Sequence, residues 1–124
     1  WGAFTAGLDA GLVYNSFPLM NGHFTPPETF APAALLHHHG WVQFAHRWLA
    51  VATGLAVLAL AARTKDAALG MMVFVQIGLG SATLLTHVSL PLSAAHQGGA
   101  IVLLALLLRR CHILAAARPD AQSP

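Results

Sequence analysis

Charged side chains are scarce in this chain: 8% of its 124 residues are Asp, Glu, Lys or Arg, whereas 56% are hydrophobic. Soluble domains usually carry about 25% charged residues. The scarcity therefore excludes an ordinary soluble domain and predicts an integral membrane protein. The formal net charge of +2 is too small to indicate a nucleic-acid partner, and there is no glycine-rich phosphate loop.

Cysteine is almost absent, because Cys111 is the single example. One cysteine excludes an internal disulfide and any zinc site built from cysteines. It ends an apolar run beside Arg109 and Arg110, so we expect an ordinary residue at the membrane edge. The chain also lacks an arrangement of Ser, His and Asp, or of Cys and His, suited to nucleophilic catalysis.

Long apolar runs supply the expected fold. Residues 41–62 form a span about 33 Å long at the helical rise, enough to cross the hydrocarbon core. Residues 67–88 and the shorter 93–108 form two more spans, with a turn at 89–92. Residues 1–12 are apolar but about half a span, and we interpret them as the end of a truncated helix. The prediction is an all-α integral membrane protein with three complete transmembrane helices plus the end of a fourth.

The remaining segments have the composition of loops. Residues 13–40 are rich in Pro, Asn, Gly and His, which predicts an outer loop with a short helical turn within 28–36. Residues 41–110 then form the membrane region, and residues 111–124 a tail whose end, 115–124, is polar and frayed.

Basic residues predict the orientation. Arg63 and Lys65 follow the first span, and Arg109, Arg110 and Arg118 follow the third. Three crossings put both groups on one side, which the positive-inside rule makes cytoplasmic. The loop at 13–40 then faces the periplasm of a bacterium or the intermembrane space of a mitochondrion. The corresponding location is the bacterial inner membrane or the mitochondrial inner membrane.

Two histidines within the spans are the main functional signal. His46 lies five residues inside the first span, and His96 lies four or five residues beyond Pro91. Helical rise puts both about 6 to 8 Å below the same surface. An ionisable side chain in a bilayer is costly and usually has a partner or a ligand. Two imidazoles at one depth can bind haem iron between two helices; alternatively, each histidine bonds only a neighbouring helix.

Polar neighbours of the histidines are candidates for supporting roles. Arg47 suits a haem propionate, since its guanidinium matches carboxylate geometry. Gln43, one turn from His46, and Gln97, beside His96, are candidates for hydrogen bonds to the two ligands. Gln76, at mid-membrane, predicts a hydrogen bond between helices.

Other candidates are weaker. His87 ends the second span on the same side and is a rival ligand, although an interfacial position is the preferred interpretation. The adjacent residues His37, His38 and His39 do not converge on one ion in an extended loop, so we expect them to be solvated. Asp9 is placed either to pair with Arg47 or to cap a helix.

Several stretches together resemble the haem A synthase family, in its mitochondrial and proteobacterial branch. They are the Gly-Leu-Asp-Ala-Gly-Leu-Val-Tyr-Asn-Ser-Phe-Pro-Leu-Met stretch at 7–20, the histidine motif at 42–47, and residues 76–85 followed by 91–100. The resemblance covers about residues 2–108. Two positions depart from the family: Ala45 stands where Asp is usual, and His87 where a histidine is usually absent.

The resemblance implies an eight-helix membrane protein made of two similar four-helix halves, of which this chain is the C-terminal half. That half of the family holds a haem b through two axial histidines, which correspond to His46 and His96. The other half oxidises a methyl group of haem O to the formyl group of haem A, so no catalytic residue is expected here.

The expected function is therefore that of a haem A synthase-like oxidoreductase, with haem b as cofactor and a fragment that is inactive alone. Its expected partners are membrane lipid and, in the missing half, haem O; the electron donor is not indicated. One alternative is a b-type cytochrome that transfers electrons as a homodimer. Another is a structural membrane subunit without a cofactor.

Overall fold

The computed structural model describes residues 1–117, which are helical where they are regular, apart from an isolated β-bridge between Met20 and His23. Their elements in chain order are α1 (Gly2–Gly7), the 3-10 helix η1 (Ala10–Leu12), α2 (Ala34–His37), α3 (His39–Thr64), α4 (Ala67–Leu85) and α5 (Leu90–Ala116). Three of these, α3, α4 and α5, are long and apolar enough to cross a membrane. The predicted all-α membrane class is confirmed.

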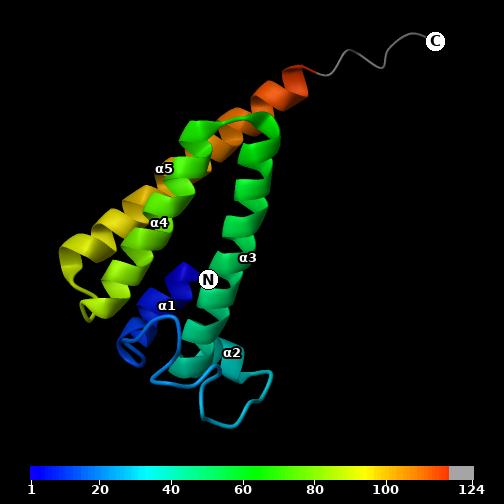
Figure 1. Ribbon diagram of the computed structural model, residues 1–124. Helices are drawn as coiled ribbons and strands as arrows, with labels where there is room; N and C mark the ends of the chain where they lie inside the picture. The colour runs from blue at the N-terminus through cyan, green and yellow to red at the C-terminus, as the bar shows by residue number, and fades with distance from the viewer. Residues whose placement is uncertain (118–124) are drawn as a thin grey trace.

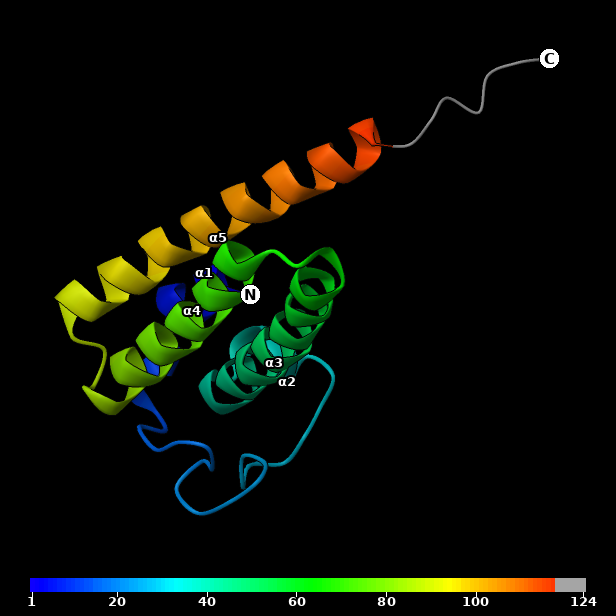
Figure 2. The ribbon, with the colours of Figure 1, turned by 45° about the horizontal axis from the view of Figure 1, so that its top comes forward.

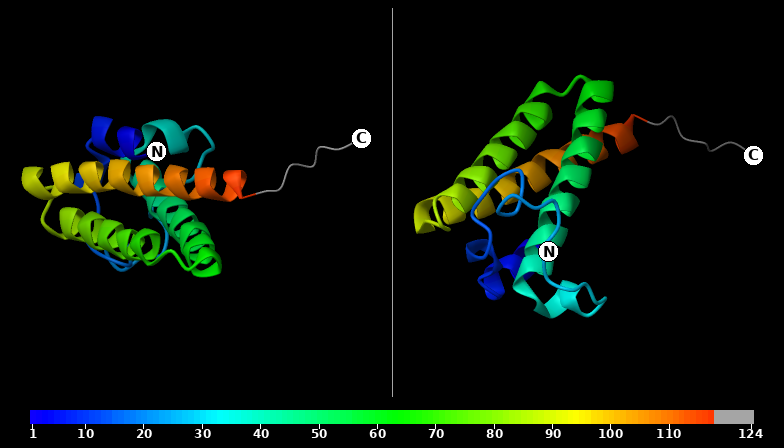
Figure 3. Two further views of the ribbon diagram at one scale, coloured as in Figure 1. Left: turned by 90° about the horizontal axis from the view of Figure 1, so that it is seen from above. Right: turned by 60° about the horizontal axis from the view of Figure 1, so that its bottom comes forward.

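The three long helices form a bundle that is closed at one end and open at the other. In Figure 1, α3 and α4 meet at the top and diverge downward, where α1 lies. Figure 2 shows α5 beside α4 and extending past its end, and the left view of Figure 3 agrees. Backbone contacts join α4 to both α3 and α5, whereas α3 and α5 make no comparably extensive contact within residues 1–117.

The closed end contains the apolar core. Buried side chains of α3 and α4 form its centre and leucines of α5 pack against them: Val57, Ala61, Leu69 and Val73, with Leu103, Leu106 and Leu107. A Cβ added at Gly70 would lie 3.6 Å from the Cβ of Ala61, so these small residues let α3 and α4 approach closely.

Asp66 joins all three helices at this end. Lys65 takes a left-handed conformation (φ 53°) that ends α3, and Asp66 caps α4 by accepting a hydrogen bond of 3.1 Å from the Leu69 amide. Arg110 of α5 donates from Nε to Asp66 Oδ2 at 2.7 Å and forms an ion pair with the same carboxylate. The Leu69 and Arg110 hydrogen bonds lower the pKa of Asp66 from its ordinary 3.8.

Large apolar side chains of the long helices face outward. Leu55, Phe74 and Ile101, one from each long helix, are 63%, 65% and 70% exposed. An exposed apolar surface of this extent suits contact with lipid rather than water.

Several boundaries differ from the sequence prediction. Helix α5 begins at Leu90, before the predicted 93, and continues to Ala116 instead of 108. Pro91 lies in its first turn, where a missing N–H costs nothing, so the proline starts the helix rather than forming a separate turn. Helix α4 ends at Leu85, because His87 and Val88 have positive φ. The helical turn expected within 28–36 is α2, at Ala34–His37. Of the predicted tail, residues 118–124 lie outside the described residues.

We expect Arg110→Ala to lower the thermal unfolding midpoint of the detergent-solubilised protein, because the substitution removes the cationic partner of Asp66. Arg109→Ala is the matched control, since the neighbouring Arg109 is exposed. A carboxyl group with a lowered pKa stabilises the fold above its ordinary value, and this contribution is lost as the pH falls through the folded-state pKa. The difference between the variants should therefore be present at pH 7 and shrink below about pH 4. Equal midpoints at pH 7 would contradict the role of this ion pair.

Candidate functional site

The two histidines singled out in the sequence lie on α3 and α5, towards the ends of these helices that are remote from Asp66. His46 and His96 are both half-buried. A Cβ added at Gly2 of α1 would lie 3.5 Å from Cε1 of His46. Both histidines therefore lie at the open end of the bundle, and His46 lies beside the start of α1.

His96 lies directly against the backbone of α4. A Cβ added at Gly80 would be 2.8 Å from Cε1 of the His96 ring, a distance that real Cβ atoms essentially never show. Glycine is therefore required at position 80 for the imidazole to occupy this place.

Gln76, one helical turn before Gly80, makes the polar contact with His96. Its Nε2 lies 3.1 Å from His96 Nδ1 and 2.9 Å from the His96 carbonyl oxygen. Within residues 1–117 its Oε1 is buried without a hydrogen-bond partner, and a Cβ at Gly99 would lie only 2.4 Å from that oxygen. The predicted hydrogen bond between helices is confirmed, and its partner is the candidate ligand itself.

Gln97 lies elsewhere than the sequence suggested. It is exposed and makes no side-chain hydrogen bond among the described residues, so the structure shows no contact that would support His96. Sequence reasoning missed Gln76 as the partner of His96. The signal was the spacing: Gln76 and Gly80 share one face of α4, and His96 and Gly99 share one face of α5.

Arg47 fastens the outer loop to α3. Its Nη2 donates to the Tyr14 carbonyl at 2.8 Å, and Nη1 donates to the carbonyls of Pro18 and Leu19 at 3.2 and 3.4 Å. Its Nε is buried and has no hydrogen-bond partner in the described part of the chain. The guanidinium is therefore bonded to loop carbonyls. Its pairing with a haem propionate stays a prediction. Asp9 is exposed, forms no side-chain cap and is not bonded to Arg47, so both of its predicted roles are wrong.

A second set of contacts holds the loop. Gln43 is buried and donates to the Tyr14 carbonyl at 3.2 Å, so it serves the loop rather than His46. The Tyr14 hydroxyl donates to Glu28 at 2.5 Å, and Trp41 Nε1 donates to the Glu28 carbonyl at 3.2 Å. Gly40 is needed here, since a Cβ would lie 3.1 Å from both Tyr14 and Glu28.

The electrostatics of the Tyr14–Glu28 pair follow from this packing. Burial, the hydrogen bond to Glu28 and the negative charge of Glu28 together raise the pKa of Tyr14 to about 12. Burial would raise the pKa of Glu28, but the Tyr14 hydrogen bond, its own backbone amide and the charge of His38 lower it. Tyr14 therefore stays a hydrogen-bond donor and Glu28 an acceptor at neutral pH.

The other histidines lie in exposed positions. His87 is in the turn between α4 and α5, and His37, His38 and His39 are exposed at the end of α2 and the start of α3. Within residues 1–117 no three or more His, Cys, Asp or Glu side chains gather in a way that could hold a metal ion.

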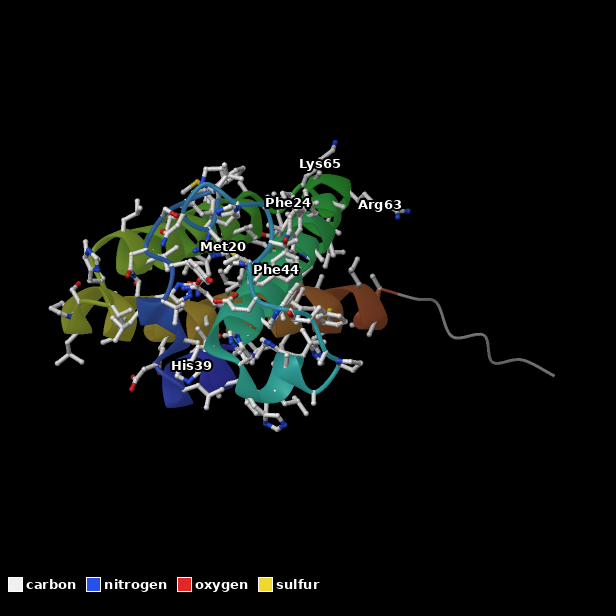
Figure 4. All side chains as sticks on the ribbon, turned by 90° about the horizontal axis from the view of Figure 1, so that it is seen from below. Met20, Phe24, His39, Phe44, Arg63 and Lys65 are labelled. Carbon is white, nitrogen blue, oxygen red and sulfur yellow. The ribbon has the colours of Figure 1, made fainter. Side chains whose placement is uncertain are left out.

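In Figure 4, Arg63 and Lys65 point away from the helices, whereas Met20 and Phe44 lie among neighbouring side chains.

Comparison with known proteins agrees with this architecture. The family model COX15-CtaA, described as cytochrome oxidase assembly protein, matches residues 1–108. A heme A synthase from Rhodospirillum centenum is 45% identical over 92% of this chain and 34% of its own length. Heme A synthase COX15 from Bos taurus is 43% identical over 86% of the chain and 30% of its own length. No solved structure matches.

The chain belongs to the COX15-CtaA family of cytochrome oxidase assembly proteins. It spans about a third of the length of the curated relatives that it matches, which also include the human heme A synthase COX15 at 42% identity. The resemblance found in the sequence motifs is therefore confirmed at the level of the family.

We expect Arg47→Met to make the loop at 13–30 easier to cleave by a protease in detergent solution, because the loop carbonyls lose three hydrogen bonds. Arg63→Met is the matched control, since Arg63 is an exposed residue at the opposite end of α3. Cleavage sites can be mapped by mass spectrometry. An unchanged cleavage rate in Arg47→Met would show that other contacts hold the loop.

Proposed function

We propose that this chain is the haem b-binding membrane region of a haem A synthase, an oxidoreductase that converts haem O into haem A for terminal oxidases. Its family and the names of its relatives support the enzyme class. The observation that carries the site is the position of His46 on α3 and of His96 on α5, both at the open end of one bundle.

The residues at the open end fit a haem. Imidazole nitrogen is a common axial ligand of haem iron. Gln76 occupies the Nδ1 side of His96, which leaves Nε2 as the ring nitrogen for a metal. Gly80 provides the room in which the ring lies. The amide nitrogen of Gln76 contacts this ring, and its Oε1 is a buried acceptor that has no partner among residues 1–117.

The two imidazoles decide what the site could do. A bound haem b would supply one-electron transfer. If His46 and His96 both held its iron, no position would remain for a substrate, so the site would suit electron transfer and not the oxidation of haem O. The oxidation would occur in a part of the protein outside this chain, and haem O would bind there.

The outer loop would cover this site on one side of the membrane. Arg47 and Gln43 hold the loop near the start of α3 through the Tyr14 carbonyl. The basic residues Arg63, Lys65, Arg109 and Arg110 lie near the other ends of the helices. By the positive-inside rule that end is cytoplasmic, and the loop lies in the periplasm or intermembrane space.

Optical spectra of the full-length protein test the ligand pair. We expect a low-spin b-type haem in the parent and in the control His87→Ala. His46→Ala and His96→Ala should each lose one low-spin haem or convert it to high spin. Retention of that haem in both variants would overturn the proposal. Conversion of haem O to haem A by the parent would support a synthase, whereas an active electron carrier without this conversion would favour a dimeric b-type cytochrome.

A pair of glycine substitutions tests the position of His96. Gly80→Ala should remove most of the low-spin signal, because the new Cβ would collide with the imidazole. Gly78→Ala is matched in residue type and helix, but a Cβ at position 78 has nothing within 4 Å. We expect its spectrum to equal that of the parent. Equal spectra for both variants would show that the ring lies elsewhere.

A further inference from the structure

We propose that Gln76 is a positioning residue for His96, and that its two amide atoms serve the imidazole in turn. In the arrangement seen here the amide nitrogen faces Nδ1. When His96 binds iron through Nε2, the amide oxygen accepts the hydrogen bond from Nδ1–H. This inference rests on the proposed haem site and deepens it.

The present contact fixes which ring nitrogen carries the proton. Gln76 Nε2 lies 2.9 Å from the carbonyl oxygen of His96, and a carbonyl oxygen only accepts. The atom in this place is therefore the amide nitrogen. It also lies 3.1 Å from Nδ1, so Nδ1 accepts and the proton of a neutral ring is on Nε2.

Binding of iron reverses this requirement. A neutral imidazole that binds a metal through Nε2 carries its proton on Nδ1, and ligating histidines almost always donate that N–H to an oxygen. The amide nitrogen of Gln76 cannot accept it. The amide oxygen can, and it is buried next to Gly99 without a hydrogen-bond partner among residues 1–117. A buried acceptor without a hydrogen bond costs free energy. If Gln76 only packed the two helices, there would be no reason for its oxygen to be left unpaired.

A half-turn of the amide exchanges the two atoms. The terminal torsion of glutamine is soft, so the turn needs no change of backbone. It gives up the bond to the His96 carbonyl, which in α5 still has its ordinary helical partner, the amide of Ala100. After the turn the amide oxygen of Gln76 would face the carbonyl oxygen of His96, and two acceptors repel each other. The amide oxygen must therefore also move away from that carbonyl towards Nδ1.

The glycines provide the room for this exchange. A Cβ at Gly99 would lie 2.4 Å from Oε1, and a Cβ at Gly80 would lie 2.8 Å from the ring. Both helices thus lack a side chain at the points where the amide and the imidazole lie.

The test uses the full-length protein with Gln76→Glu, Gln76→Leu and the control Gln97→Leu. Haem b content and the midpoint potential of that haem are measured for each. Glutamate is a stronger acceptor, so it should push electron density to the iron and lower the potential. Leucine should weaken haem retention by about 10- to 100-fold, the range for lost outer partners of metal ligands. Gln97→Leu should match the parent in both respects.

The outcomes separate this inference from the proposed site. If the parent holds a haem on His46 and His96, but Gln76→Glu has the potential of Gln97→Leu, then Gln76 only packs the helices and the inference is overturned. If the parent holds no haem on this pair, both proposals are overturned. Should Gln76→Leu fail to fold, as judged by circular dichroism, the potential of Gln76→Glu decides.

Discussion

A polar side chain inside a membrane span must find its hydrogen-bond partners within the protein, because the lipid offers none. His96 meets this constraint through Gln76, and the contact requires α5 to lie close to α4 at Gly80 and Gly99. Helix α3 is joined to the pair at the other end. Helices α3 and α4 diverge from there towards the histidine end (Figure 1).

The two ends of the bundle are thus held together by different interactions. At the closed end an apolar core and the Asp66–Arg110 ion pair hold three helices together. At the open end the helices diverge, and the order comes from side chains that bind loop carbonyls, chiefly Arg47 and Gln43. The half-buried imidazoles of His46 and His96 thus lie away from the apolar core.

The sequence predicted the spans well, because lipid burial imposes long apolar runs that need no knowledge of packing. It also proposed His46 and His96 as a pair from their depth along the helices, and that pairing stays a prediction. The sequence prediction failed where a contact depends on which face of one helix packs against another helix. Gln97 is next to His96 in sequence, yet adjacent residues on a helix point about 100° apart, so Gln97 turns outward. The partner, Gln76, comes from another helix. The hydrogen bonds from Arg47 to loop carbonyls likewise depend on the conformation of the loop, so the sequence did not predict them.

The most direct test of the central claim is a structure of the full-length protein with its haem bound. The account predicts one iron between the Nε2 atoms of His46 and His96, with the Oε1 atom of Gln76 within hydrogen-bond distance of His96 Nδ1. A haem bound through other residues, or an intact contact between Gln76 Nε2 and His96 Nδ1 with no iron on the ring, would contradict it.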